Sequence, residues 1–375
     1  MGARNPSKSE AERLDWLRLY RSENVGPATF FRLLDYFGTA ARALDALPDL
    51  ARRGGGKRPV KVAAASIAER EFEALAKLGA SLLLASDPDF PAPLRAVETV
   101  PFLTVRGHAS LLTRDAIAVV GARNASAAGR RFAQTIAADL GKADLVVVSG
   151  MARGIDSSAH EGSLETGTVA VLAGGVDVIY PPENAKLYER IVETGCVVSE
   201  MPPGTQPQAS HFPRRNRLIS GLALGVVVVE AASRSGSLIT ARIALEQGRE
   251  VFAVPGSPLD PRSEGPNGLI KQGATLTESA ADVLQGLADI LRRPLAEPGA
   301  GPADGPASPP ALPPENDLAE AREKVTEALG STPVPVDEII RQCHLSPAIV
   351  SMVLLEMELA GRLERHPGGQ VARVF

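Results

Sequence analysis

Between residues 115 and 290 the chain alternates short apolar runs with longer amphipathic segments. Most of the apolar runs are rich in β-branched residues and lead into turns that contain glycine; they lie at 117–120, 145–148, 169–172, 226–229 and 251–254. Such continuous runs predict strands buried on both faces, as in a parallel sheet. The segments between them predict helices at 125–140, 155–166, 214–222 and 237–247. We therefore expect an α/β fold whose central domain, residues 81–292, is a Rossmann-like, doubly wound, mostly parallel sheet.

The first 80 residues have helical rather than strand periodicity. Leu14 and Leu17, followed by apolar positions from Phe30 to Phe37, have the spacing of two amphipathic helices. We expect an N-terminal helical domain over residues 8–80, of a SAM or helix-hairpin-helix type. The tight turn at 24–29 either presents backbone N–H groups to a phosphate, as in half of a helix-hairpin-helix, or is an ordinary connection between helices.

The C-terminal part changes composition abruptly. Residues 294–316 contain eight prolines and three glycines, which is typical of a tether, and we place a linker at 293–316. Residues 317–375 then predict three helices and a two-stranded wing around 367–369, the outline of a winged-helix-like domain. Its third helix has Glu356 and Glu358 but no Lys or Arg, so it lacks the donors of a DNA-reading helix. We expect an independent protein-contact or regulatory module.

Composition and charge limit the possible functions. The chain has 375 residues, a formal net charge of −4 and only two cysteines, which argues against a disulfide framework or a cysteine-based zinc site. A nucleic-acid binder of this charge needs a local basic patch. The N-terminus has no apolar signal core, and no apolar run reaches membrane-spanning length. These features predict a cytoplasmic protein with no membrane association.

Several kinds of cofactor chemistry lack their sequence signatures. G-x-G-x-x-G is absent, so NAD or FAD binding is not expected, and so is the P-loop of nucleotide hydrolases. The five histidines have no metal-ligand spacing. Asp156, Ser158 and His160 have the composition of a catalytic triad, but within five residues of one helix the serine cannot face both partners. We expect a capping Asp156, a structural His160, no cofactor and no enzymatic activity.

Arginine is concentrated near the predicted strand ends. Arg123 follows the first strand of the central domain, Arg153 follows the second, and Arg234 precedes a helix that starts with serine and glycine. Residues 214–249 contain six arginines against only two acids. Because the carboxyl ends of parallel strands meet at one edge, and because helix N-termini favour anions, this edge is predicted to bind a polyanion.

Several motifs in the same region resemble one known family. They are GAR (121–123), SGMARGIDSSAH (149–160), YPPEN (180–184), FPRRNRLISGL (212–222), RSGSLITARIALEQGREVFAVPG (234–256) and GLIKQGA (268–274). Together they are similar to the DprA/Smf family of DNA-processing proteins over about residues 80–290. The family's first motif usually reads Gly-Ser-Arg, whereas Ala122 here removes one hydroxyl donor.

The resemblance implies sequence-independent binding of single-stranded DNA that enters during natural transformation. It also implies protection of that DNA, loading of a RecA-type recombinase, and a homodimer formed through the Rossmann-like domain. The residues expected to contact DNA are Arg123, Ser149, Gly150, Arg153, Lys186, Phe212, Arg214, Arg215, Asn216, Arg217, Arg234, Ser235, Gly236 and Ser237. Alanine at Arg123, or at both Arg214 and Arg215, is expected to weaken binding without affecting stability.

Aromatic residues make up only 4% of the chain, with Phe212, Tyr180 and Tyr188 near the predicted edge. Single-strand binders commonly stack bases on aromatic rings, so we expect phosphate contacts to dominate here.

Two other functions remain open. The domain distantly resembles nucleotide phosphoribohydrolases of the lysine-decarboxylase-like group, whose signature P-G-G-x-G-T-x-x-E supplies a catalytic glutamate. The corresponding turn here, residues 234–240, has no glutamate at the fourth position after its Gly-Ser pair. The remaining possibility, a nucleotide-binding or protein-interaction scaffold, assigns no role to the arginines.

Overall fold

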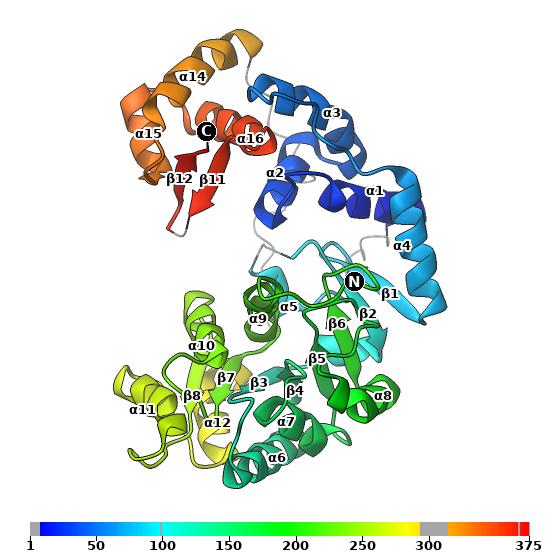
Figure 1. Ribbon diagram of the computed structural model, residues 1–375, viewed down its shortest axis with the longest axis vertical. Helices are drawn as coiled ribbons and strands as arrows, with labels where there is room; N and C mark the ends of the chain where they lie inside the picture. The colour runs from blue at the N-terminus through cyan, green and yellow to red at the C-terminus, as the bar shows by residue number, and fades with distance from the viewer. Residues whose placement is uncertain (1–7, 98–99, 293–313, 367, 375) are drawn as a thin grey trace. The chain divides into compact units, whose positions relative to one another are not determined.

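The computed structural model describes residues 8–97, 100–292, 314–366 and 368–374 (Figure 1). The chain divides into two compact units. The sheet unit consists of residues 73–292. The small-domain unit combines the two ends of the chain, residues 8–72 and 314–374. The predicted linker at 293–316 lies outside the described residues except for its last three, and Glu315 already begins a helix.

The sheet unit is built on nine strands in the order β1-β2-β6-β5-β4-β3-β7-β8-β9. The strands are β1 (Ala80–Leu84), β2 (Phe102–Gly107), β3 (Ala116–Val120), β4 (Val146–Ser149), β5 (Thr168–Val171), β6 (Cys196–Ser199), β7 (Gly225–Val228), β8 (Glu250–Ala253) and β9 (Thr275–Leu276). From β6 to β9 all neighbours pair in parallel, and the β1–β2 hairpin joins β6 in antiparallel fashion. The prediction of a mostly parallel, Rossmann-like sheet is confirmed.

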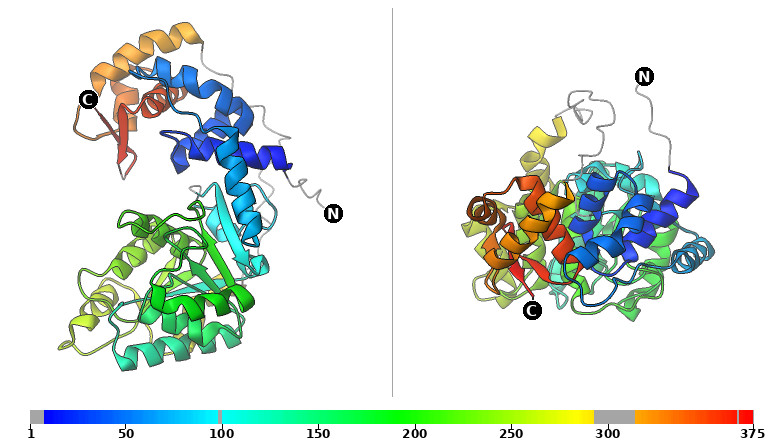
Figure 2. Two further views of the ribbon diagram at one scale, coloured as in Figure 1. Left: turned by 45° about the vertical axis from the view of Figure 1, so that its right-hand side comes forward. Right: turned by 90° about the horizontal axis from the view of Figure 1, so that it is seen from above.

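Helices cover both faces of this sheet (Figure 2). They are α5 (Ala92–Arg95), α6 (Ala127–Lys142), α7 (Ile155–Ser163), α8 (Ala185–Thr194), α9 (His211–Gly221), α10 (Gly236–Glu246), α11 (Glu264–Lys271), α12 (Ala280–Gly286) and α13 (Ala288–Arg292). Alternate side chains of each strand enter different cores, because successive residues of a strand point to opposite faces. Ile117 and Val119 of β3 pack with α6, α7 and α12, whereas Ala118 and Val120 pack with α9 and α10.

The strand order places a change of direction beside β3. The chain passes from β3 to β4 on one side, and after β6 it returns to pair β7 with the other side of β3. In open α/β sheets such a switch point leaves a crevice beyond the carboxyl ends of the strands, and ligands bind there. The turns after β3, β4 and β7 carry the predicted arginines, so the topology brings these turns to one place.

The small-domain unit contains four N-terminal helices and a C-terminal winged-helix domain. The helices are α1 (Glu10–Arg21), α2 (Pro27–Phe37), α3 (Ala40–Arg53) and α4 (Ala65–Lys77), followed at the other end by α14 (Glu315–Ala328), α15 (Val336–Cys343) and α16 (Pro347–Leu359). Strands β10 (Val334–Pro335), β12 (Gln370–Arg373) and β11 (Leu363–His366) form a sheet in that order. Both predicted domain types are confirmed.

The wing of the winged-helix domain turns at 367–369. Pro367 lies outside the described residues, but Gly368 and Gly369 have φ angles of 78° and 69°. These left-handed conformations favour glycine because a Cβ would meet the backbone. The two glycines therefore allow the tight hairpin between β11 and β12.

The expectation that residues 317–375 form an independent module is wrong. These residues and residues 8–72 belong to the same compact unit. The amide of Asn24 donates a hydrogen bond of 2.8 Å to the carbonyl oxygen of Leu359, at the end of α16. The composition of the linker indicated separation along the chain, but contacts made by the helices decide which parts pack together.

No single helix among the described residues is long and apolar enough to cross a membrane. Helices α15 and α16 pass this test only as a pair, and they are bent by 118° with respect to each other.

Candidate nucleic-acid interface

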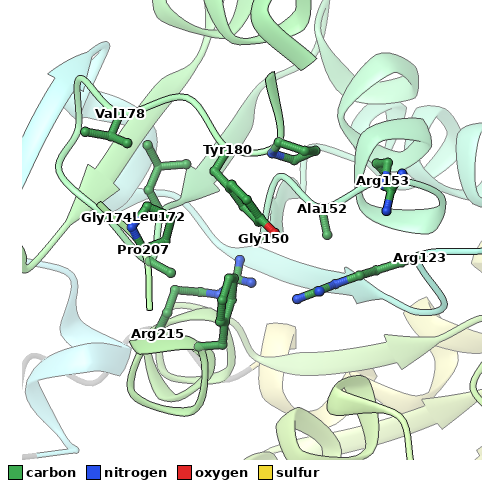
Figure 3. Close-up of a pocket in the computed structure, with 13 residues that line it drawn as sticks. Arg123, Gly150, Ala152, Arg153, Leu172, Gly174, Val178, Tyr180, Pro207 and Arg215 are labelled. Carbon is green, nitrogen blue, oxygen red and sulfur yellow. The ribbon is translucent and has the colours of Figure 1, made fainter. Parts of the chain in front are cut away.

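A pocket with about 490 Å³ of space lies at the carboxyl ends of β3, β4 and β5. Figure 3 shows Arg123, Tyr180 and Arg215 pointing into the same space from three different segments. The residues that line the pocket are Arg123, Gly150, Ala152, Arg153, Leu172, Ala173, Gly174, Val178, Tyr180, Pro181, Pro207, Phe212 and Arg215. The volume is within the range of small-molecule sites, and the lining combines apolar walls with guanidinium groups.

A larger, open groove shares one wall with this pocket. Arg123, Ala152, Phe212 and Arg215 line both. The groove continues past the turn after β7 and the start of α10, where Arg234, Ser235, Gly236 and Ser237 lie, and reaches Asp260 and Arg262 after β8. The pocket and the groove together form a continuous surface over the switch point of the sheet, which we call the DNA face.

The aromatic rings of the DNA face are arranged around Phe212. The ring centroids of Tyr180 and Phe212 are 5.9 Å apart, and the planes are tilted by 55°. The guanidinium of Arg123 lies 5.0 Å from the Phe212 centroid, within the range of a cation–π contact. Tyr180 is 46% exposed. A flat ring and an adjacent cation are therefore both accessible at the mouth of the pocket.

Arg215 is a buried strut below the pocket rather than a surface cation. Only 7% of the residue is exposed, and its guanidinium donates a 3.0 Å hydrogen bond to the carbonyl oxygen of Val171 at the end of β5. Burial lowers the pKa of Arg215 to about 10, so the side chain remains charged at neutral pH. A Cβ atom at Gly150 would lie 1.7 Å from this guanidinium. Glycine at 150 is thus required for Arg215 to occupy its position.

Asp156 is the buried acid that accompanies Arg215. Burial raises the pKa of its carboxyl, while Arg215 and the backbone N–H groups of Ala152 and Gly150 act in the opposite direction. The carboxylate accepts a hydrogen bond from the N–H of Ala152. Asp156 therefore holds the 149–153 turn against α7, which agrees with the predicted capping role.

His160 is structural, as expected from the sequence. The residue has no exposed surface, and its Nδ1 lies 2.7 Å from Oγ1 of Thr168, whose hydroxyl donates to the carbonyl oxygen of Val147. Because that hydroxyl proton is already used, Nδ1 of the neutral ring carries the proton and donates it to Thr168. Burial, with Arg215 nearby, lowers the pKa of His160 to about 3. This neutral histidine has no nucleophile to activate.

The shift at His160 predicts a pH dependence of stability. The unfolded histidine titrates near pH 6.5, so the unfolded state binds a proton below this pH, whereas the folded state does not bind it until about pH 3. Stability from this group is complete above pH 6.5 and falls by about 1.4 kcal/mol per pH unit below it. Asp156, with its raised pKa, has the opposite effect. The difference in unfolding free energy between the wild type and His160→Gln, measured from pH 7.5 to 4.5, isolates the histidine. A difference that does not change with pH would contradict this assignment.

Two helix N-termini near the DNA face differ in their availability to an anion. At the start of α6 the carboxylate of Glu230 accepts hydrogen bonds from the backbone N–H (2.9 Å) and the hydroxyl (2.6 Å) of Ser126, so a protein anion already occupies this end. At the start of α10, by contrast, Ser235, Gly236 and Ser237 line the groove. Only the second of these two ends therefore offers its helix dipole to a ligand in the groove.

Two predicted DNA contacts are wrong for the side chains concerned. Ser149 has no exposed surface, and its hydroxyl donates a 2.6 Å hydrogen bond to the carbonyl oxygen of Val119. Arg217 is paired with the buried Glu200, with one N···O distance of 2.6 Å. Both side chains satisfy buried polar groups within the fold, and neither lines the pocket or the groove.

The other predicted residues fall into two groups. Those that line the DNA face are Arg123, Gly150, Arg153, Phe212, Arg215, Asn216, Arg234, Ser235, Gly236 and Ser237. Asn216 is buried and donates to the carbonyl oxygen of Gly236, so it supports the start of α10. Arg214 and Lys186 are exposed on α9 and α8 but line neither the pocket nor the groove.

Three residues of the DNA face were not identified from the sequence. Asn124 and Thr240 line the groove, as does Arg262, whose guanidinium is paired with Asp260 at 2.8 Å. Arg262 lies in a short 3-10 helix (Pro261–Ser263) about 8 residues beyond β8, outside any of the quoted motifs. Asn124 directly follows Arg123, so its position after the first strand was the one usable signal.

Among the described residues, no group of three or more histidine, cysteine, aspartate or glutamate side chains is arranged to hold a metal ion.

Comparisons with known proteins agree with this architecture. The family profile of DNA recombination-mediator protein A matches residues 81–288. A DprA-like N-terminal HHH domain matches residues 10–74, and a DprA winged helix domain matches residues 308–369.

Individual relatives give the same result. The chain is 40% identical over 294 residues to Protein Smf of Escherichia coli (strain K12), which covers 77% of this chain and 76% of that protein. It is 42% identical over 224 residues to DNA processing protein DprA of Bacillus subtilis (strain 168), which covers 59% of this chain and 75% of that protein.

Two solved structures are also similar. DNA processing protein A from Streptococcus pneumoniae has a TM-score of 0.62 and 35% identity, and the match covers 74% of this chain and 98% of that one. DNA processing protein A from Helicobacter pylori, whose structure is described in terms of its single-stranded DNA binding mode, has a TM-score of 0.51 and 28% identity over 56% of this chain and 96% of that one. The family profile, the long matches at high identity and the shared fold confirm the resemblance seen in the motifs, and the chain belongs to the DprA/Smf family, whose profile is that of DNA recombination-mediator protein A.

Proposed function

We propose that this chain binds single-stranded DNA on the DNA face, without reading its sequence, and acts on DNA taken up during transformation. The observation that carries this proposal is the joint position of Arg123, Phe212 and Tyr180 at the mouth of the pocket that opens into the groove. A cation and two rings at one place match the two parts of a nucleotide, the phosphate and the base.

Charge on the DNA face favours a polyanion over a neutral ligand. Arg123, Arg153 and Arg234 are exposed there, and the open N-terminus of α10 adds backbone donors. The acids that line the two cavities are Asp156, which is buried against Arg215, and Asp260, which is paired with Arg262. The exposed charge in the cavities is therefore predominantly positive.

The shape of the pocket favours single strands over duplex. A base can lie against Phe212 or Tyr180 only if it leaves its own stack, and an unpaired base does so at lower cost than a paired one. Phosphate contacts and stacking on a ring do not distinguish one base from another, so little sequence preference is expected. The relative from Helicobacter pylori is described as a single-stranded DNA binder, which agrees with this reasoning.

Membership of the family supports the finer parts of the proposal. The family is named for recombination mediation, which supports loading of a RecA-type recombinase onto the bound strand. Two relatives are named as DNA processing proteins, which supports a role in the processing of incoming DNA. A homodimer through the sheet unit and a cytoplasmic location complete the proposal and rest on the family resemblance and on composition.

An enzyme of the phosphoribohydrolase type is less well supported. Such an enzyme needs a glutamate in the turn at 234–240, and none is present. Of the two acids that line the cavities, Asp156 is only 5% exposed and is held by backbone N–H groups. We therefore do not assign a catalytic residue.

The proposal predicts a strong preference for single-stranded over double-stranded DNA, together with a steep salt dependence. The logarithm of the binding constant should fall linearly with the logarithm of salt concentration, with a slope of about −0.7 for each phosphate neutralised. The measurement is a gel-shift titration with labelled single strand and unlabelled single- and double-stranded competitors at several salt concentrations. Competitors of equal strength at moderate salt, or binding that does not depend on salt, would overturn the proposal.

A further inference from the structure

Helix α16 is the third helix of the winged-helix domain, the one that in DNA-binding members of this architecture lies in the major groove. Six consecutive residues of this helix, Met352 to Met357, are all buried. Six residues span more than one and a half turns at 3.6 residues per turn, so this part of the helix is covered on every side. One small domain can cover only part of that circumference, and the remaining cover comes from residues 8–72 of the same unit.

The two acids of α16 are both used inside the small-domain unit. Glu356 has no exposed surface and accepts two hydrogen bonds, at 2.7 and 2.9 Å, from the guanidinium of Arg322 in α14. Glu358 accepts a 2.7 Å hydrogen bond from the hydroxyl of Thr29 in α2 and a 2.8 Å hydrogen bond from Arg365. One acid thus stabilises the winged-helix domain internally, and the other connects it to the N-terminal helices.

The backbone of both domains takes part in this interface as well. Asn24 donates to the carbonyl oxygen of Leu359, one of the acceptors that the end of a helix leaves unsatisfied. A Cβ atom at Gly54, which follows α3, would lie 2.0 Å from the carbonyl oxygen of Glu356. The main chains of α3 and α16 therefore approach closely enough that only glycine fits at position 54. Figure 2, right, shows the orange and red elements directly beside the blue helices.

We propose that the winged-helix domain uses α16 as a protein-docking element whose partner is the N-terminal helical domain of the same chain. The two domains then fold and unfold as one unit although more than 240 residues separate them in sequence. The helix that would enter a DNA groove is consumed by this interface. The lack of Lys and Arg in α16 and its two engaged acids follow from this role.

Cleavage of the connection between the domains tests the proposal on the full chain. A recognition site for a sequence-specific protease is inserted between Gly301 and Pro302, and complete cleavage is verified on a denaturing gel. The native digest is then separated by gel filtration at micromolar concentration. We expect the C-terminal fragment to elute with the rest of the chain. Elution of a separate C-terminal fragment from the otherwise unchanged protein would overturn the proposal.

Matched variants of the cleavable protein locate the interface. Gly54→Ala places a methyl group against the backbone of Glu356, while its φ of −67° suits alanine, so the fragment should be released. Gly26→Ala is the control, because nothing lies within 4 Å of a Cβ there and its φ of −83° is equally permissive. Equal retention in the two variants would contradict the proposed contact.

A second variant tests the interface without a steric clash. Thr29→Val removes the hydroxyl that donates to Glu358 and preserves the side-chain volume. The dissociation constant of the cleaved fragment should rise by about tenfold or more, since a hydrogen bond to a charged group is lost. Circular dichroism of the uncleaved variants checks that the helices remain folded. A Thr29→Val protein that retains its fragment as tightly as the wild type would show that α16 does not dock through this contact.

Discussion

Alanine at Arg215 is expected to lower the unfolding free energy of the sheet unit by about 3 kcal/mol, because removal of one member of a buried charged pair leaves the other without compensation. Here Asp156 remains buried and the carbonyl oxygen of Val171 loses its donor. For a unit of this size such a loss lowers the melting temperature by roughly 6–12 °C. DNA binding should fall as well, because the floor of the pocket is no longer fixed. Thermal and chemical denaturation of the purified variant measure the effect.

Arg214→Ala is the matched control for this experiment. Arg214 is the preceding residue on the same helix, but it is exposed, so its removal should leave stability within about 0.5 kcal/mol of the wild type. The sequence-based expectation that alanine at both positions leaves stability unchanged is therefore replaced. If Arg215→Ala is as stable as Arg214→Ala, the guanidinium has no role as a strut.

The second large effect is expected for DNA affinity at the mouth of the pocket. Arg123→Ala removes an exposed guanidinium that lies over Phe212, and it leaves no buried partner behind. A charge-assisted contact to a phosphate contributes roughly 1.5–3 kcal/mol, so affinity for single-stranded DNA should fall by about 10- to 150-fold. Phe212→Ala removes the ring on which a base would stack, worth roughly 1–3 kcal/mol. Fluorescence anisotropy at one fixed salt concentration provides the comparison.

Lys186→Ala controls for the general loss of positive charge. Lys186 is exposed on α8 and lies outside the pocket and the groove, so its removal changes net charge by the same amount as Arg123→Ala. We expect a change in affinity of less than about twofold, because an exposed charge far from the bound phosphates is screened by salt. Equal losses for Lys186→Ala and Arg123→Ala would mean that the DNA lies elsewhere on the chain.

The sheet was predictable because its strands are buried on both faces and its chain direction is regular. Runs such as Val226-Val-Val-Val229 have no polar face, which fits only a covered parallel strand. Strand β6, Cys196–Ser199, was missed because it is a four-residue segment with only two β-branched residues. The antiparallel β1–β2 hairpin was also missed, because the 18 or so residues that join its strands include a helix and give no turn signal.

The roles of the individual arginines could not be read from the sequence. Arg214, Arg215 and Arg217 lie on α9, where successive residues are rotated by about 100°, so neighbouring positions face different surroundings. The sequence shows the charges but not which direction faces the sheet, Glu200 or solvent. Their convergence on one edge, in contrast, follows from topology alone, and for that reason Arg123, Arg153 and Arg234 were correctly placed together.

The union of both chain ends in one unit has a consequence for synthesis. Residues 8–72 leave the ribosome first, but their docking partner α16 is completed only at Leu359, about 290 residues later. At a rate of ~5–20 residues per second the N-terminal helices wait roughly 15–60 s with this face uncovered. During that time the sheet unit between them can fold as a domain of its own. Newly made chains should therefore be most vulnerable to proteases and to wrong partners at their N-terminal end, and premature stops before residue 315 would leave that end uncovered permanently.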